Sequence, residues 1–302
     1  MHSPAIAAAL SRLDPTVVRS LARMPWHDHR VVSHATAAAL WGFGRPPFSC
    51  PTGQHGNTSR QERMHQQTVN DSDHLLPHLS VPVGAYLPRS SAACFHRLKL
   101  EAEDVSELAG IRLTTPERTW FDLLLPHSDA DRGHTLPSLS YPCSGSGSAG
   151  QRGIVMTPHE SAVVWAEALL HRRLVSLASL RTLVDRNAGS LGVSIARRAL
   201  EQIVRGPRRP EDSLVRLRLA EAGLRPRRDV VVLCQQTIRR YRFALAFPAS
   251  KVGVAFHTCE CPPGRPEGWT VAGITPERLA ERDGLAQEVE RAFYEGVALN
   301  SR

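Results

Sequence analysis

Two short apolar segments near the C-terminus bear most directly on chemistry. They are residues 240–248 and 251–257, and both show the alternation that is typical of β-strands. Alternation places large side chains on one face of a strand and small ones, here Ala244 and Ala255, on the other. A Mg²⁺ centre that hydrolyses phosphodiesters would need acidic oxygens converging from neighbouring strands. The small-residue face offers none, so these segments predict a sheet without metal-binding carboxylates.

The nearest candidate ligands are Asp212 and Glu211, at the start of a helix predicted over residues 211–222. Two carboxylates are a small set for Mg²⁺, which prefers a near-octahedral shell of oxygens. An alternative stays open in which Asp212, Glu211 and Glu260 act as relocated ligands, with Mg²⁺ as the cofactor. Otherwise we expect no cofactor and no metal site.

Other reactive side chains give weaker signals. His257, Cys259 and Cys261 lie close together, but they lack the paired spacing and the fourth ligand of a typical zinc site. The prolines and glycine that follow favour a turn there. Cys94 and His96 could form a nucleophile–base pair, although their spacing alone is slight support. The sequence contains no His-Glu-x-x-His motif, no P-loop and no glycine-rich dinucleotide loop.

Positive charge is concentrated in one stretch. Residues 197–242 hold thirteen arginines against five acidic residues, which accounts for the whole net charge of +8. Such a block favours a polyanionic partner, and a solvated arginine-rich surface is the alternative. We expect nucleic-acid contacts from Arg197, Arg198, Arg205, Arg208, Arg209, Arg216, Arg227 and Arg228.

The composition is that of a globular chain, with 302 residues of which 42% are hydrophobic. No apolar run approaches the roughly 18 residues of a membrane span. The start of the chain lacks a signal-peptide pattern, and its six cysteines are scattered. We therefore expect a cytoplasmic protein without a membrane partner. The sequence does not indicate its oligomeric state.

Helix and strand signals divide the chain into four segments. Ser33 and Gly42 flank one predicted helix, strands are expected at 81–87, 92–98 and 111–113 around an acidic turn, and Thr115 opens a further helix. A Gly/Ser-rich stretch is typical of a linker. The expected segments are residues 1–126, a linker or insertion at 127–152, a helical region at 153–206, and 207–302 with the order α-β-β-β-β-α.

This order and several motifs resemble a family in which an AbiEi-type antitoxin region is joined to a Vsr-like endonuclease domain. In the first half the motifs are residues 32–42 (VSHATAAALWG), 96–100 (HRLKL) and 103–119 (EDVSELAGIRLTTPERT). In the second half they are Asp212-Ser213, Arg216, residues 222–224, 229–256 and 268–271, and Thr275. The resemblance implies an α/β (α+β) chain, with a helical antitoxin-like N-terminal region followed by a small restriction-endonuclease-like domain.

The resemblance also implies where the chemistry is missing. The family has an acid where Asp212 stands, but it has Asp and Glu where this chain has Ala244 and Ala255. Only about thirty residues precede Ser33, so we expect the usual winged helix-turn-helix to be truncated or absent. We therefore expect no catalytic residues, with Asp212, Ala244 and Ala255 as vestigial positions. The expected function is non-catalytic nucleic-acid binding or an antitoxin-type contact with a cognate toxin. An active metal-dependent endonuclease and an eroded protein without retained activity are the alternatives.

Overall fold

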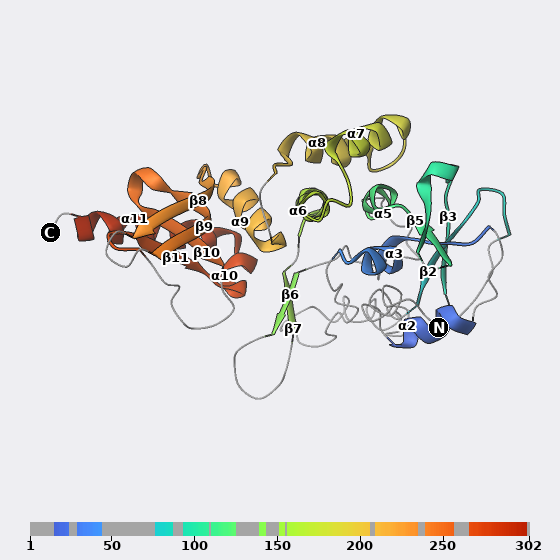
Figure 1. Cartoon of the computed structure of the whole chain (residues 1–302), viewed down its shortest axis with the longest axis horizontal. Coiled ribbons are helices and arrows are strands. Elements are labelled where there is room, and N and C mark those ends of the chain that lie inside the picture. Colours follow the sequence, from blue (N-terminus) through green and yellow to red (C-terminus); the bar gives the residue numbers. More distant parts are fainter. Residues whose placement is uncertain are drawn as a thin grey trace, which may run out of the picture. The chain divides into compact units, whose positions relative to one another are not determined.

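The structure is a computed structural model that divides the chain into two compact units (Figure 1). Unit 1 comprises Met1–Ser138 and Leu174–Glu201, and unit 2 comprises Leu139–Arg173 and Gln202–Arg302. Among the described residues, no helix combines the length and apolar character needed to cross a membrane. The described residues are 15–23, 29–43, 76–86, 93–108, 110–124, 139–142, 151–154, 156–205, 209–234, 239–256 and 266–300.

Unit 1 is built on a mixed five-stranded sheet with the order β3-β2-β1-β5-β4. Its core joins Val32, Leu79 and Leu113, from three different strands, to Leu40 of a covering helix. The strands are β1 (Val31–Val32), β2 (His78–Val81), β3 (Cys94–Arg97), β4 (Val105–Leu108) and β5 (Ile111–Thr114). The helices are α2 (Pro15–Arg23), α3 (His34–Trp41), α5 (Pro116–Asp122), α7 (Leu177–Arg186) and α8 (Val193–Gln202), the last residue of α8 belonging to unit 2.

Local sequence signals explain the helices of unit 1. Gly42 ends α3 in the left-handed conformation, with φ of 73°, as the sequence predicted. Thr115 caps α5 by accepting a 3.3 Å hydrogen bond from the Arg118 backbone N–H. Ser33 precedes α3 as predicted, but its side chain makes no capping bond. Its hydroxyl lies instead 2.9 Å from Nδ1 of His34.

The resemblance implied a helical N-terminal region, but this part of the chain is mixed and contains a five-stranded sheet, to which the expected strands belong. The strand predicted at 81–87 instead spans His78–Val81. It stops before Pro82, which cannot donate to a ladder. The predicted acidic turn is a 3₁₀ helix at Ala102–Asp104, followed at once by β4, which pairs with β5.

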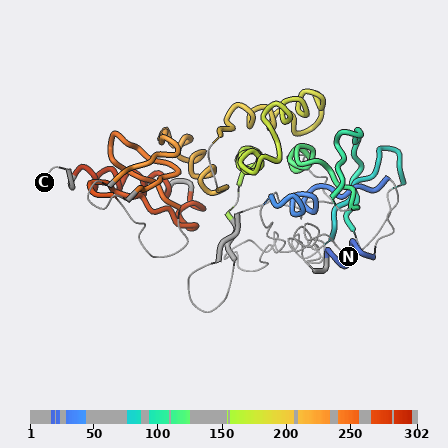
Figure 2. Tube along the Cα trace, viewed as in Figure 1, coloured from blue at the N-terminus to red at the C-terminus, as the bar shows by residue number. Residues whose placement is uncertain are grey.

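Unit 2 is centred on a four-stranded sheet with the order β11-β10-β9-β8, in which only β10 and β11 are parallel. Figure 2 traces it from α9 through the strands to α11. The elements are α9 (Pro210–Glu221), β8 (Arg227–Cys234), β9 (Arg239–Phe247), β10 (Val252–Phe256), β11 (Thr270–Ile274), α10 (Pro276–Ala280) and α11 (Arg282–Asn300). This is the predicted α-β-β-β-β-α order, with the closing helix interrupted at Glu281.

The division into units differs from the predicted segments. Residues 153–206 do not form a body of their own, because α6 (Pro158–His171) belongs to unit 2 whereas α7 belongs to unit 1. The predicted linker at 127–152 lies partly outside the described residues. Its described part contributes a hairpin to unit 2, formed by β6 (Leu139–Pro142) and β7 (Gln151–Ile154).

A buried ion pair fastens the helices of unit 2. Glu160 closes a capping box at the start of α6, where its Oε2 accepts a 2.6 Å hydrogen bond from the Thr157 backbone N–H. Its Oε1 accepts a 2.8 Å hydrogen bond from Nε of Arg218, on α9. The same guanidinium donates to the backbone carbonyl of Leu279, on α10. Both side chains of the pair are almost completely buried, so one guanidinium joins three helices.

We expect Arg218→Met to lower the free energy of unfolding of unit 2 by about 3–5 kcal/mol, because it leaves the Glu160 carboxylate buried without its cation. Urea denaturation, with hydrogen exchange of α6 and α9 amides, measures the loss. Arg278→Met is the matched control: Arg278 pairs with Glu281 at 3.5 Å on the surface, and exposed pairs contribute about 0–1 kcal/mol. Equal losses in both variants would contradict the role assigned to Arg218.

Candidate functional site

The two alanine positions lie on neighbouring strands of unit 2, as predicted, and both are half-buried. The β9–β10 ladder pairs Ala246 with Gly253, and residues directly opposite each other in a ladder share a face. Strands β9, β10 and β11 contain no acidic residue. These three strands therefore offer no carboxylate to a hard cation, and the acidic residue of β8, Asp229, is paired with Arg242.

An aromatic pair covers the face on which Gly253 lies. The Phe243 ring stacks on Trp269 with centroids 5.3 Å apart and planes 15° apart. A Cβ atom added at Gly253 would lie 2.4 Å from the Phe243 ring, so only glycine fits beneath it. The opposite face packs on α11, where Phe247 meets Phe293 at a centroid distance of 5.0 Å. Ligand space on the Gly253 side is thus taken up by aromatic rings.

Strict alternation along β9 would place Phe243 on the same face as Phe247, but the Phe243 ring lies against Gly253. The β8–β9 ladder pairs Arg228 with Leu245 and Val230 with Phe243, and it has no pair at Asp229 and Ala244 between them. Asp229 has a φ of 55°, a left-handed conformation that is uncommon in a strand. The interruption is adjacent to Phe243, and the pairing register is the same on both sides of it.

Asp212 lies in the first turn of α9 and forms an ion pair with Arg209. Nη2 and Nε of Arg209 donate to its two carboxylate oxygens at 3.0 and 3.3 Å. Burial raises the pKa of Asp212 above its usual value, and the neighbouring guanidinium partly offsets that rise. Glu211 is half-buried on the same turn, while Glu260 and the His257–Cys261 cluster lie outside the described residues. Asp212 is therefore held in an ion pair at the helix start.

The eight predicted nucleic-acid contacts fall into three groups. Arg216 is a structural residue in this fold: its side chain is 13% exposed, and it donates a 2.6 Å hydrogen bond to Glu167 of α6. Arg208 lies outside the described residues. The others are exposed, Arg197 and Arg198 on α8 of unit 1, and Arg205, Arg209, Arg227 and Arg228 in unit 2.

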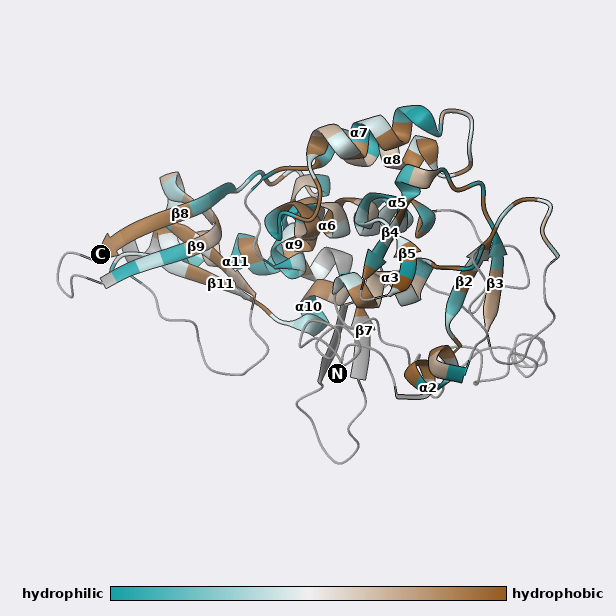
Figure 3. Ribbon diagram, turned by 45° about the vertical axis from the view of Figure 1, so that its right-hand side comes forward, coloured by the Kyte–Doolittle hydropathy of each residue, from teal (hydrophilic) through white to brown (hydrophobic). Residues whose placement is uncertain are grey.

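Strands β8 and β9 form a two-stranded ribbon that carries exposed arginines, Arg227 and Arg228 on β8 and Arg240 and Arg242 on β9. Strand β8 is an edge of the sheet, and its cross-strand pairs set Val231 against Arg242 and Leu233 against Arg240. Val231 and Leu233 are more than half exposed, and the two arginines are exposed as well. Figure 3 shows β8 changing from hydrophilic at its start to hydrophobic at its end, beside the hydrophilic start of β9. The sequence pointed to this block but not to Arg240 and Arg242 as contacts.

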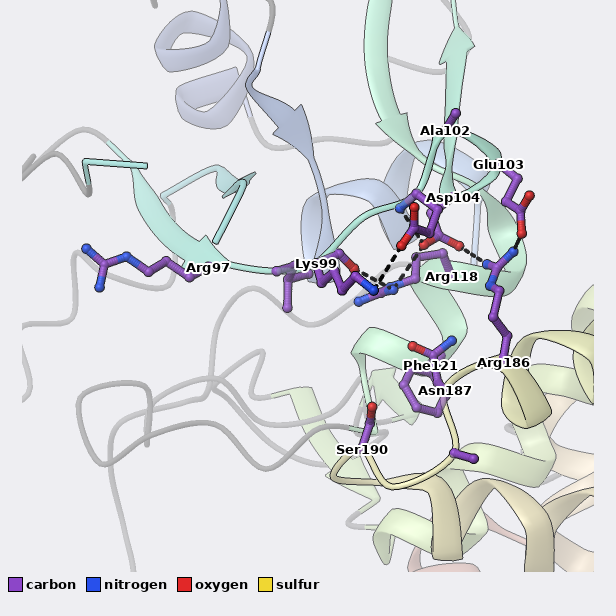
Figure 4. Close-up of a pocket in the computed structure, with 13 residues that line it drawn as sticks. Arg97, Lys99, Ala102, Glu103, Asp104, Arg118, Phe121, Arg186, Asn187 and Ser190 are labelled. Carbon is purple, nitrogen blue, oxygen red and sulfur yellow. Dashed lines mark hydrogen bonds and ion pairs between the residues drawn. The ribbon is translucent and has the colours of Figure 1, made fainter. Parts of the chain in front are cut away.

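Unit 1 contains a polar pocket of about 730 Å³ beside the start of α5 (Figure 4). Arg118 crosses its inner wall, donating a 2.7 Å hydrogen bond to Asp122 and a 3.2 Å hydrogen bond to Asp104. Arg186 of α7 forms ion pairs with Asp104 and Glu103. The carboxylates are matched by guanidinium groups, so we interpret this network as structural. The network connects α5 and α7 to the 3₁₀ helix before β4.

Burial raises the pKa of Asp122 from its ordinary value of 3.8 to about 7, against the opposing effect of Arg118. Its Oδ2 atom has no hydrogen-bond partner within the described part of the chain. A carboxyl group in this position holds a proton at mildly acidic pH.

A second cluster in unit 1 gathers three histidines and a cysteine. Nδ1 of His78 and Nε2 of His96 share a hydrogen bond of 2.9 Å, and the sulfur of Cys94 lies within 4.8 Å of a nitrogen of each ring. The His34 ring stacks on His96 at a centroid distance of 3.8 Å. The sequence suggested only the pair Cys94–His96. Their two-residue spacing puts both on one face of a strand, but nothing local links that strand to His78.

The chain matches no family model, no curated protein and no solved structure in the comparisons made with known proteins. The resemblance to antitoxin and endonuclease families therefore stays a prediction.

We expect Asp122→Asn to remove a pH dependence from the stability of unit 1. Below pH 4 the carboxyl is protonated in folded and unfolded chains, and its stabilising effect is fully present. As the pH rises toward 7, only the unfolded carboxyl ionises, and that stability is lost by up to about 1.4 kcal/mol per pH unit. Hydrogen exchange of α5 amides between pH 4 and 7.5 measures the difference between the two proteins. Parallel pH profiles would show that Asp122 is already ionised in the folded chain.

Proposed function

We propose that unit 2 binds nucleic acid through the β8–β9 ribbon. The observation that carries the proposal is the set of exposed arginines on the two strands of this ribbon, Arg227, Arg228, Arg240 and Arg242. Arginines neutralise phosphates and release counterions, which supplies sequence-independent affinity. A two-stranded ribbon also has the width that the major groove of B-DNA admits.

The orientation of two of these arginines supports a preformed surface. Nη2 of Arg242 donates to Asp229 across the strands at 2.7 Å. Nη1 of Arg228 donates to the backbone carbonyl of Arg205 at 2.6 Å, which ties the ribbon to the segment before α9. Arg227 and Arg240 are the best candidates for phosphate contacts, because both are exposed and neither takes part in these two bonds.

We propose further that this binding is non-catalytic, in an antitoxin-like protein whose endonuclease-like domain is degenerate. The support is the absence of acidic residues from β9, β10 and β11, together with the aromatic pair over Gly253. Asp212 has its carboxylate oxygens engaged by Arg209. Phosphodiester hydrolysis by metal ions would need several such oxygens placed together.

A contact with a cognate toxin is the second candidate, and one observation favours it. The edge strand β8 exposes Val231 and Leu233 beside backbone groups that β9 does not pair. An exposed edge of this kind can accept a strand from another protein. Arginines dominate the remainder of the ribbon, so nucleic acid is the partner that we favour.

We expect Arg227→Gln/Arg240→Gln to weaken duplex DNA binding and to reduce the slope of log K against log salt by about 2, since each phosphate contact contributes about 0.9. Fluorescence anisotropy of a labelled duplex over a range of salt concentrations measures this slope. Arg278→Gln/Arg291→Gln removes the same charge from exposed positions on α10 and α11. Equal slopes in the two double variants, or no binding by the wild type at low salt, would refute the ribbon as the interface.

We expect no cleavage of plasmid or linear DNA in Mg²⁺ or Mn²⁺, because strands β9, β10 and β11 supply no acidic ligands and Asp229 of β8 is paired with Arg242. Gel analysis of supercoiled plasmid detects even single nicks. Asp212→Asn, which preserves the size of the side chain, is the control. Cutting by the wild type that this variant abolishes would support relocated ligands and an active endonuclease instead.

A further inference from the structure

We propose that His78, Cys94 and His96 in unit 1 form a binding site for Zn²⁺. Each of the three residues offers a ligand atom, and all of these atoms lie within 4.8 Å of one another. His78 is buried, whereas Cys94 and His96 are half-buried, so solvent can deliver an ion to the cluster. The proposal concerns unit 1 alone and does not depend on nucleic-acid binding by unit 2.

The sheet brings the three residues together by register. Strands β2 and β3 are parallel, with His78 opposite Cys94 and Ser80 opposite His96. Opposite residues share a face, and so do residues two positions apart along a strand. His78, Cys94 and His96 therefore point to the same side of unit 1's sheet although fifteen residues separate the first two in the sequence.

The two imidazole nitrogens already lie near the spacing that a metal requires, and the Cys94 sulfur lies within 4.8 Å of a nitrogen of each ring. Zn²⁺ binds imidazole nitrogen at about 2.0–2.1 Å and thiolate sulfur at about 2.3 Å, so tetrahedral ligand atoms lie roughly 3.3–3.7 Å apart. Nδ1 of His78 and Nε2 of His96 are 2.9 Å apart, which means that they need to separate by only a few tenths of an ångström. The ion would replace the proton that these two nitrogens share.

The donor types select the ion. Two imidazoles and a thiolate suit Zn²⁺, whereas Mg²⁺ and Ca²⁺ prefer oxygen ligands. Three protein ligands leave a fourth tetrahedral position for water or an exogenous ligand, which is the arrangement of reactive rather than purely structural zinc sites.

Surrounding residues fix the orientation of the ligands. The His34 ring stacks on His96 with planes 24° apart, and its Nδ1 lies 2.9 Å from the Ser33 hydroxyl. Ser80 donates a 2.7 Å hydrogen bond to that same hydroxyl. His34 has a φ of 50°, an unfavourable backbone conformation for a non-glycine residue, and such outliers concentrate at functional sites. We assign His34 as a positioning residue, because a ring stacked on a ligand limits that ligand's rotation.

Cobalt substitution tests the site directly. The full-length chain, freed of metal with a chelator, is titrated with Co²⁺ and followed by absorption spectroscopy. We expect one equivalent to bind with the visible bands of tetrahedral Co²⁺ and a near-ultraviolet thiolate charge-transfer band, and Zn²⁺ to bleach both. Cys94→Ser should abolish the charge-transfer band, and His96→Gln should weaken binding by at least about tenfold.

A matched variant separates this site from the other cysteine cluster. Cys259→Ser/Cys261→Ser removes two thiols from the segment that lies outside the described residues and should leave the spectrum unchanged. No tetrahedral spectrum in the wild type, or a charge-transfer band that survives Cys94→Ser and disappears in this double variant, would overturn the proposal. Circular dichroism of each variant establishes that it is folded.

His34→Ala tests the positioning role separately. We expect it to weaken Co²⁺ binding by about tenfold, as losses around metal ligands commonly do, while the Cys94 charge-transfer band is retained at saturating metal. Unchanged affinity would refute the positioning role, and loss of the band at saturation would indicate that His34 shapes the ligand set itself.

Discussion

The pairing of buried arginines with carboxylates is the constraint on which both units depend. A charge removed from water must be matched by an opposite charge and by hydrogen bonds. In unit 2 the Glu160–Arg218 pair satisfies this requirement while it joins α6, α9 and α10. In unit 1 Arg118 does the same between Asp104 and Asp122, and Arg186 adds α7. The helices that complete each core are thus located by these polar contacts as well as by apolar packing.

This constraint changes how the basic composition is interpreted. Part of the arginine excess in residues 197–242 is internal, since Arg216 and Arg218 are committed to Glu167 and Glu160. Of the exposed arginines in the described part of this stretch, four lie on the ribbon of unit 2 and two on α8 of unit 1, while Arg205, Arg209 and Arg225 lie in the segments on either side of α9. A local charge count therefore overstates the surface that a polyanion can meet. The ribbon is the better guide, because its arginines share two paired strands.

Features that depend on residues close together in the sequence could be predicted, whereas features that depend on tertiary contacts could not. Thr115 and Gly42 are short-range signals, and they located helix ends correctly. The succession of helices and strands along unit 2 was also predictable, because each strand there has its own apolar run. The two-residue strand β1 carries too little sequence to be detected, so the strands expected in unit 1 were not recognised as one sheet. The cluster of His78 with Cys94 depends on parallel pairing, which is a tertiary contact that no local spacing encodes.

Successive segments of the chain belong alternately to the two units, which affects how the protein folds during synthesis and how it can be divided into fragments. Unit 1 is completed by residues 174–201 and unit 2 begins at residue 139, so the polypeptide passes from one unit to the other three times. Neither unit is a contiguous stretch, and a fragment cut at the apparent boundary near residue 207 would separate Arg218 from Glu160. On the ribosome, unit 1 must wait for a segment made after unit 2 has started to emerge. Each unit therefore needs two separate stretches of the same chain, and neither can be expressed or exchanged as one continuous segment.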